Sequence, residues 1–172
     1  MKPARIAARD RRNSAIHEAG HVTIGRHIGL AAICAWLEKT PSPGSYDKLW
    51  VGHTRYTSSS ILVGKMPRKK LPLFAVAGAV AEFCWQQVTF DETLGDECWH
   101  DVDTMSESDW AGCGCAPGNP TRQLFKTVET VFALLDREAG ALWPALLSEA
   151  RRLIVDSRET SVYRGPAPAK GD

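Results

Sequence analysis

The chain has 172 residues, 44% of them hydrophobic, and a formal net charge of +1 at pH 7. This length can bury one sizeable core, so a single domain is expected. The near-neutral charge argues against a dedicated nucleic-acid binder. The most apolar run, residues 71–83, is too short to span a bilayer and contains Glu82. The basic N-terminal segment is not followed by the apolar stretch that a signal peptide requires. We therefore predict a cytoplasmic protein with neither a membrane nor a nucleic-acid partner.

The first predicted element is a helix around the sequence SAIHEAGHVTIGRHIG. Residues 1–12 are expected to form a basic N-terminal arm, loose over its first eight residues. The helix should begin between Arg9 and Ser14, and it should end at Gly29, because glycine favours helix C-termini.

The later elements follow from periodicity and turn residues. Segments at about 32–39 and 49–57 flank the turn-rich PSPGSYD and predict an antiparallel strand pair. A buried helix is expected over residues 71–88. Residues 121–156 predict two helices, broken near Gly140.

The fold class expected from these patterns is mainly α (α+β), with a small antiparallel β pair. Residues 13–156 should form the single domain, and residues 157–172 read as a disordered tail. The charge run KMPRKK at residues 65–70 is typical of a solvated loop.

The most informative motif is His17, Glu18 and His21. Two histidines four residues apart lie on one face of a helix and can bind one metal ion, with the glutamate beside them to take a proton from water. This HExxH arrangement is typical of zinc metallopeptidases. The small Ala19 and Gly20 allow another element to approach closely. The alternative is an amphipathic helix whose histidines are merely hydrogen-bonded.

A third protein ligand is expected from the acidic segment 101–109. Asp109 is the preferred candidate, because Ser106 three residues earlier places it in the first turn of a helix and so fixes its direction. Asp101 and Asp103 are the alternatives.

Glu82 stands in an otherwise apolar helix, and a buried carboxylate normally has a partner. It is expected to support the site by accepting a hydrogen bond from a ligand histidine. It could instead be a ligand itself or a member of a structural ion pair.

Two rival metal schemes remain. His27 matches the third histidine of HExxHxxGxxH, but Gly25 comes one position late and an unbroken helix turns His27 away from the metal. Five cysteines suit reduced thiols better than disulfides. A separate structural zinc site would use Cys98, His100, Cys113 and Cys115, whose spacings are tighter than usual.

The motifs carry a family resemblance. IHEAGHVTIG resembles the HEAGHA helix of the peptidase domain of FtsH, the membrane-anchored AAA+ zinc protease. AGAVAEFCWQQ looks like that family's AGRxAEE helix, and MSESDW is similar in position to its segment carrying an aspartate zinc ligand. Over residues 13–112 the resemblance implies a zincin-like helical peptidase domain, with Asp109 completing the zinc site.

The chain also departs from the family. Where the family has an arginine after AG, this chain has Ala79 or Val80, depending on how the block is aligned. Where the family has a second acid after AE, this chain has Phe83. Neither an ATPase nor a membrane segment is expected, so any activity should be ATPase-independent.

The expected function is that of a zinc metalloendopeptidase, with zinc as cofactor and a peptide or protein as substrate. A metal-activated water would hydrolyse the peptide bond with Glu18 as general base. The alternative is a non-catalytic zinc-binding or interaction protein that keeps the fold, and a third is an adaptor of a mobile-element or repressor-cleaving system. We also allow for a homo-oligomer.

Overall fold

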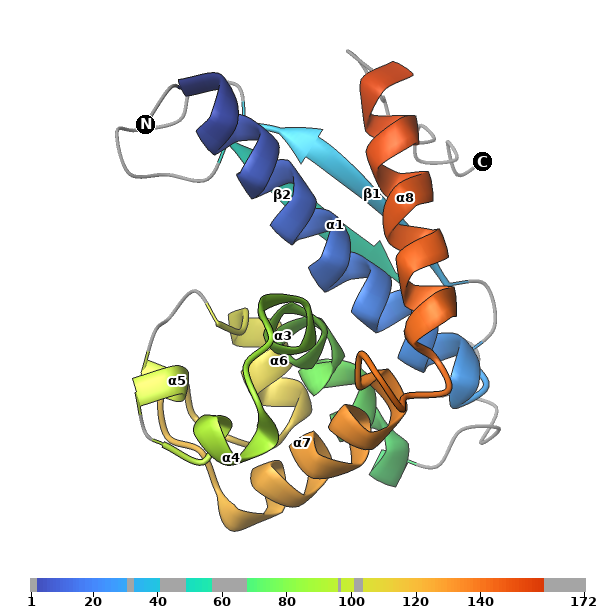
Figure 1. Ribbon diagram of the computed structural model, residues 1–172. Helices are drawn as coiled ribbons and strands as arrows, with labels where there is room; N and C mark the ends of the chain where they lie inside the picture. Colours follow the sequence, from blue (N-terminus) through green and yellow to red (C-terminus); the bar gives the residue numbers. More distant parts are fainter. Residues whose placement is uncertain are drawn as a thin grey trace, which may run out of the picture.

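The protein is mainly helical, with a small two-stranded antiparallel sheet, as predicted. The computed structural model describes residues 3–30, 33–40, 49–56, 68–95, 97–100 and 104–159. One group of elements comprises α1 (Pro3–His27), β1 (Cys34–Lys39), β2 (Trp50–Arg55) and α8 (Trp143–Glu159). The other comprises η1 (Arg68–Lys70), α3 (Leu71–Gln86), α4 (Phe90–Thr93), α5 (Glu97–His100), α6 (Glu107–Gly112) and α7 (Arg122–Leu135). The two groups meet where α1 packs across α3 (Figure 1).

Helix α1 is longer than the sequence indicated. The prediction that the helix begins between Arg9 and Ser14 is wrong, because α1 begins at Pro3. The prediction of a loose N-terminal arm is therefore also wrong for the described residues from Pro3 onwards. Two side chains fix this N-terminal half to β2. The Asp10 carboxylate accepts the Trp50 N–H at 2.7 Å, and the Ser14 hydroxyl donates to the Trp50 carbonyl at 3.0 Å. Tertiary contacts therefore extend the helix beyond its apolar stretch.

The C-terminus of α1 is the predicted glycine end. Gly29 has a φ of 89°, a left-handed conformation that glycine adopts without a steric penalty. Its N–H donates to the Arg26 carbonyl at 3.1 Å, and the Leu30 N–H donates to the Gly25 carbonyl at 2.8 Å. These bonds satisfy carbonyls that the helix end leaves free.

The strand pair is also confirmed. β1 and β2 pair antiparallel, with Cys34 opposite Arg55 and Lys39 opposite Trp50. Ala35 on β1 is buried and Trp36 half-buried, the alternation of a sheet with one face on the core.

Helix α3 forms the centre of the core, and its predicted extent is confirmed to within two residues. Its middle is built of small residues, so α1 and α3 approach at backbone distance. A Cβ at Gly20 would lie 2.3 Å from the Ala77 carbonyl oxygen and 2.7 Å from the Ala81 Cβ. Immediately before α3, residues 68–70 of the predicted solvated loop form the short helix η1, in which Lys69 is exposed and Lys70 half-buried. Residues 65–67 lie outside the described part.

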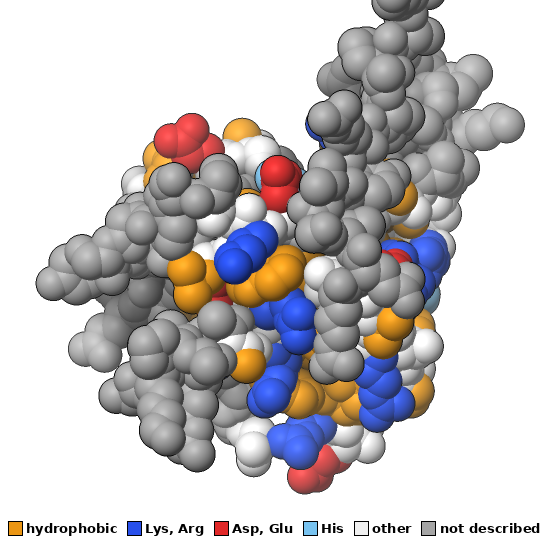
Figure 2. Space-filling view, turned by 90° about the horizontal axis from the view of Figure 1, so that it is seen from above, with side chains coloured by type: hydrophobic (Ala, Val, Ile, Leu, Met, Phe, Trp, Pro, Cys, Tyr) orange, Lys and Arg blue, Asp and Glu red, His pale blue; other side chains and the backbone are white. Residues whose placement is uncertain are grey.

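The C-terminal third consists of the two predicted helices. Val128 and Leu135 on the apolar face of α7 are fully buried. Helix α8 continues to Glu159, three residues past the expected end, and the remaining tail lies outside the described residues. Among the described helices, none combines the length and the hydropathy needed to cross a membrane. Lysine and arginine side chains lie among hydrophobic ones on the face seen in Figure 2.

A buried carboxylate connects α8 to α1. The Glu149 side chain is 7% exposed and receives Arg26 Nη1 at 3.1 Å and Arg152 Nη2 at 2.6 Å. Burial acts to raise the pKa of Glu149, but the hydrogen bonds and charges of Arg152 and Arg26 outweigh it, so the pKa is lowered. The ionised form therefore stabilises the folded state.

We expect Glu149→Gln to lower the free energy of unfolding by about 1–2 kcal/mol at neutral pH, because the three charge-assisted hydrogen bonds from Arg26 and Arg152 weaken. A carboxyl group whose pKa is lowered on folding contributes stability above its unfolded pKa and loses it as the pH falls through the folded pKa. In urea unfolding, the difference in the free energy of unfolding between variant and wild type should be present at about pH 7 and should become smaller below about pH 4. The exposed Glu138→Gln is the control, and an equal difference at both pH values would contradict the ion-pair account.

Candidate metal centre

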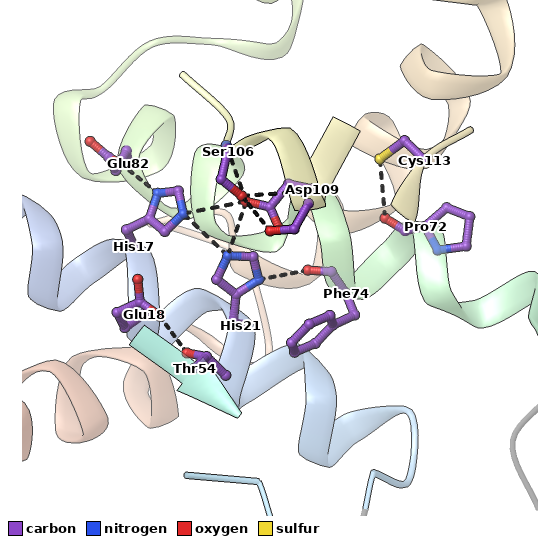
Figure 3. Close-up of polar contacts among 11 residues, drawn as sticks. His17, Glu18, His21, Thr54, Pro72, Phe74, Glu82, Ser106, Asp109 and Cys113 are labelled. Atoms are coloured by element: carbon purple, nitrogen blue, oxygen red, sulfur yellow. Dashed lines mark hydrogen bonds and ion pairs between the residues drawn. The ribbon is translucent and has the colours of Figure 1, made fainter. Parts of the chain in front are cut away.

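Helix α1 brings together the metal-binding side chains that the sequence suggested. His17 and His21 lie one turn apart on α1 and face Asp109, which comes from α6 (Figure 3). One ligand atom from each of the three residues lies within 4.8 Å of the others. His21 and Asp109 are buried, and His17 is partly buried. This group can hold a metal ion.

The spacing of the three atoms fits a small metal ion. The Nε2 atoms of His17 and His21 are 3.2 Å apart, and Asp109 Oδ2 lies 4.0 Å from the first and 3.8 Å from the second. A triangle with these sides has its corners about 2.1 Å from one common point, close to the roughly 2.0–2.2 Å of zinc–nitrogen and zinc–oxygen bonds. The ligand atoms therefore need little rearrangement to share one ion.

Each histidine is oriented by an acceptor on its far nitrogen. His17 Nδ1 lies 2.7 Å from Glu82 Oε1, and His21 Nδ1 lies 2.8 Å from the Phe74 carbonyl oxygen. A carbonyl only accepts, so the Nδ1 of His21 carries the hydrogen, and the carboxylate favours the same tautomer in His17. Both Nε2 atoms then turn lone pairs toward Asp109, which is the arrangement that metal binding requires.

The electrostatics of the two imidazoles differ. Burial lowers the pKa of both, but the hydrogen bond and charge of Glu82 outweigh it in His17, whose pKa is raised. The pKa of His21 is lowered by burial and by the neighbouring His17. The two directions differ because Glu82 contacts His17, whereas His21 accepts no such support from a carboxylate on its Nδ1.

Asp109 is fixed by the capping box predicted from the sequence. The Ser106 hydroxyl accepts the Asp109 N–H at 3.2 Å, and Ser106 donates its hydroxyl and its N–H to Asp109 Oδ2 at 2.7 and 3.3 Å. The oxygen that caps α6 is the same oxygen that faces the two histidines. Local helix-start chemistry therefore orients the carboxylate before any metal binds.

Glu18 lies beside the histidines but is held by β2. Thr54 donates its hydroxyl to Glu18 Oε2, and Glu18 is 7% exposed (Figure 3). β2 passes so close that a Cβ at Gly52 would lie 2.3 Å from the Glu18 Cγ. Glu18 thus supplies no atom to the metal-binding group but lines the same clefts as His17.

The chain matches no protein-family model, and no curated protein is similar to it at a significant level.

Among the side chains that the structure describes, no other candidate from the sequence joins this group. His27 is exposed at the end of α1, and Asp101 and Asp103 lie outside the described residues. The thiols of Cys98 and Cys113 donate to the separate carbonyls of Glu92 and Pro72. Cys115 lies 3.4 Å from the Thr121 hydroxyl, and the His100 side chain is not among those described.

Several supporting groups were not foreseen. Gly78 on α3 makes room for His17, because a Cβ there would lie 2.3 Å from His17 Nε2. Thr54, Gly52 and the Phe74 carbonyl are the others. A glycine inside a strand indicates a close backbone approach, so Gly52 carried such a signal.

Two clefts meet at the site. The first has a volume of 480 Å³ and is lined on one side by β2 residues from Gly52 to Arg55 and on the other by Phe74 and Asp109. The second, of 320 Å³, continues along β2 towards Trp50. Both are lined by His17, Glu18, Gly52 and Ser106. The metal-binding group thus borders a groove that follows β2.

We expect Glu82→Gln to lower zinc affinity by roughly 10–100-fold, because the amide holds the His17 imidazole less firmly and makes it less basic. Titration against a competing chelator measures this change. The exposed Glu129→Gln on α7 is the control. Unchanged affinity together with lost stability would instead make Glu82 a structural ion-pair member.

Proposed function

We propose that the protein is a zinc-dependent metallopeptidase of the HExxH type that hydrolyses peptide bonds without an ATPase. The observation that carries the proposal is the convergence of His17 Nε2, His21 Nε2 and Asp109 Oδ2, with Glu18 beside them in a groove. Two imidazoles and one carboxylate are the ligand set of many catalytic zinc sites, which leave a position open for water. The resemblance of the HEAGH helix to the FtsH peptidase domain supports the same assignment.

Each residue then has a distinct task. His17, His21 and Asp109 would hold zinc, which supplies a water of lowered pKa, about 7, and a Lewis acid for the peptide carbonyl. Glu18 accepts the proton of the attacking water and passes it to the leaving amine. Glu82 keeps the His17 imidazole in the tautomer that binds metal.

Within the described residues β2 pairs with β1 along one edge, and its other edge is suited to an extended substrate. The Thr40 N–H donates to the Leu49 carbonyl at 2.9 Å, so this pair is hydrogen-bonded and alternate β2 residues turn their backbone groups away from β1. Those residues are Trp50, Gly52 and Thr54. The Trp50 groups are used by α1, whereas Gly52 and Thr54 line the groove. A peptide added along this edge would pass the metal-binding group.

Metal analysis of the purified protein, combined with a generic peptidase assay, tests the proposal. We expect about one zinc per chain and cleavage that a chelator removes and zinc restores. Bound zinc without cleavage in a broad peptide library would favour the non-catalytic alternative. A protein that binds no zinc under any condition would exclude both readings.

A further inference from the structure

Two basic residues of β2 border one end of the groove, and their side chains lie with Trp36 on the outer face of the sheet. His53 and Arg55 on β2 line the 480 Å³ cleft, and Arg55 is exposed while the His53 side chain is 41% exposed. Leu71 lines the same cleft, and it directly follows Lys69 and Lys70 of η1. The cleft is thus bordered by Arg55 itself, whereas Lys69 and Lys70 are neighbours in sequence of a lining residue.

The two β2 side chains are held in place by one indole. The ring of Trp36 on β1 stacks on His53 with 5.1 Å between centroids and an interplanar angle of 26°. The Arg55 guanidinium lies 5.2 Å from the centroid of the same ring. Because the indole restrains both side chains, they lose less conformational freedom on binding a ligand than free side chains would.

Few acids neutralise this end. Glu38 lies nearest on the outer face, with its Oε2 3.6 Å from His53 Nε2, and its side chain is 65% exposed. Inside the cleft, Glu18 is bonded to Thr54, and Asp109 is bonded to Ser106 and faces the histidines. Within the described part of the chain, no ion pair joins an acid to Arg55, Lys69 or Lys70.

The opposite end has the opposite charge. The 320 Å³ cleft beyond His17 is lined by Asp10 and Glu82, and none of its described lining residues is a lysine or an arginine. The lining of the groove thus changes from acidic near Trp50 to basic near Arg55, with the metal-binding group between them. An extended ligand along β2 would experience this change in charge along its length.

We propose that the groove selects acidic peptide segments, with aspartate or glutamate side chains placed beside His53 and Arg55, on one side of the bond that is cleaved. This inference rests on the proposed peptidase function and specifies its substrate class. In an added strand, side chains two residues apart share a face, so two acids at alternate positions would both lie beside the basic side chains of β2.

Three peptides of one sequence test the proposal, with glutamate, glutamine or lysine at two alternate positions. Two such sets are made, one with the varied positions on the N-terminal side of a bond that wild type cleaves and one with them on the C-terminal side. Binding is measured by fluorescence anisotropy on the zinc-loaded Glu18→Gln variant, and cleavage is measured on wild type. We expect the glutamate peptide on one side to bind about three- to tenfold more tightly than the glutamine peptide, and the lysine peptide more weakly still. About 0.5 M salt should largely remove the difference.

A charge-reversal variant tests whether Arg55 causes the preference for glutamate peptides. Arg55→Glu should abolish or reverse the order of the three peptides, whereas Arg151→Glu, the same change at an exposed site on α8, should leave it unchanged. If Arg55→Glu does not fold, Arg55→Gln should reduce the preference and its salt dependence. A preference that survives both Arg55 changes overturns the proposal.

The failures of the two proposals are distinguishable. Cleavage without any preference for glutamate over lysine overturns the acidic specificity and leaves the peptidase proposal intact. If wild type cleaves no peptide, the same sets are tested for binding to zinc-loaded wild type. Selective binding of the glutamate peptides then supports the acidic groove and argues against catalysis, and the absence of selective binding overturns the acidic groove as well.

Discussion

Replacing Glu18 with glutamine should reduce kcat/KM for peptide cleavage by at least about 10²–10⁴-fold while zinc content stays at the wild-type level. Glu18 supplies none of the three ligand atoms of the metal-binding group, and its carboxylate is bonded to Thr54 instead. Glutamine has almost the same size, so it fits the narrow space beside Gly52 and removes only the proton acceptor.

Steady-state kinetics and metal analysis of the same preparation provide the measurement. Glu107→Gln is the matched control, since Glu107 is exposed at the start of α6, near the cleft but outside its lining. Full activity in the Glu18 variant would remove the peptidase mechanism. Loss of zinc in that variant would mean that Glu18 acts as a ligand.

The parts of the site that arise from local sequence were predictable. The spacing of His17 and His21 places both imidazoles on one face of any helix, whatever surrounds it. The three-residue spacing of Ser106 and Asp109 predicts a capping box, and the structure forms it. In both cases the geometry depends on a single turn of helix, which is why short-range patterns suffice.

The supporting contacts depend on the tertiary fold and could not be predicted in the same way. Thr54 reaches Glu18 across 36 residues of sequence, and the Phe74 carbonyl reaches His21 across 53. A carbonyl carries no sequence signal, and a threonine in a strand is common. The N-terminal extension of α1 likewise depends on bonds to the backbone of Trp50, which no local pattern encodes.

Glu82 lies between these two cases. Its position in an apolar helix indicated a partner, but the identity of that partner depended on how α3 crosses α1. The small residues at the crossing, Gly20 and Gly78, bring the two backbones close enough for the carboxylate to reach His17 Nδ1. The same close packing that builds the core therefore also orients a metal ligand.

Asp109→Asn should weaken zinc binding by more than about 100-fold and remove peptide cleavage with it, because a ligand contributes more than the supporting residues, for which roughly 10–100-fold is usual. Ser106 remains the N-cap in this variant, and the amide oxygen of asparagine at the third helical position can still accept from Ser106. Helix α6 should therefore remain intact, and the loss isolates the missing carboxylate charge from any unfolding.

Zinc affinity by chelator competition, activity and the thermal unfolding midpoint of the metal-free protein together test this assignment. Asp101→Asn and Asp103→Asn are the controls, since each removes the same charge from the same acidic segment, and both should retain zinc and activity. Full zinc content in Asp109→Asn, with loss in either control, would transfer the ligand role to that residue. The distances of 3.8 and 4.0 Å from Asp109 Oδ2 to the two imidazoles are what make Asp109 the stronger candidate.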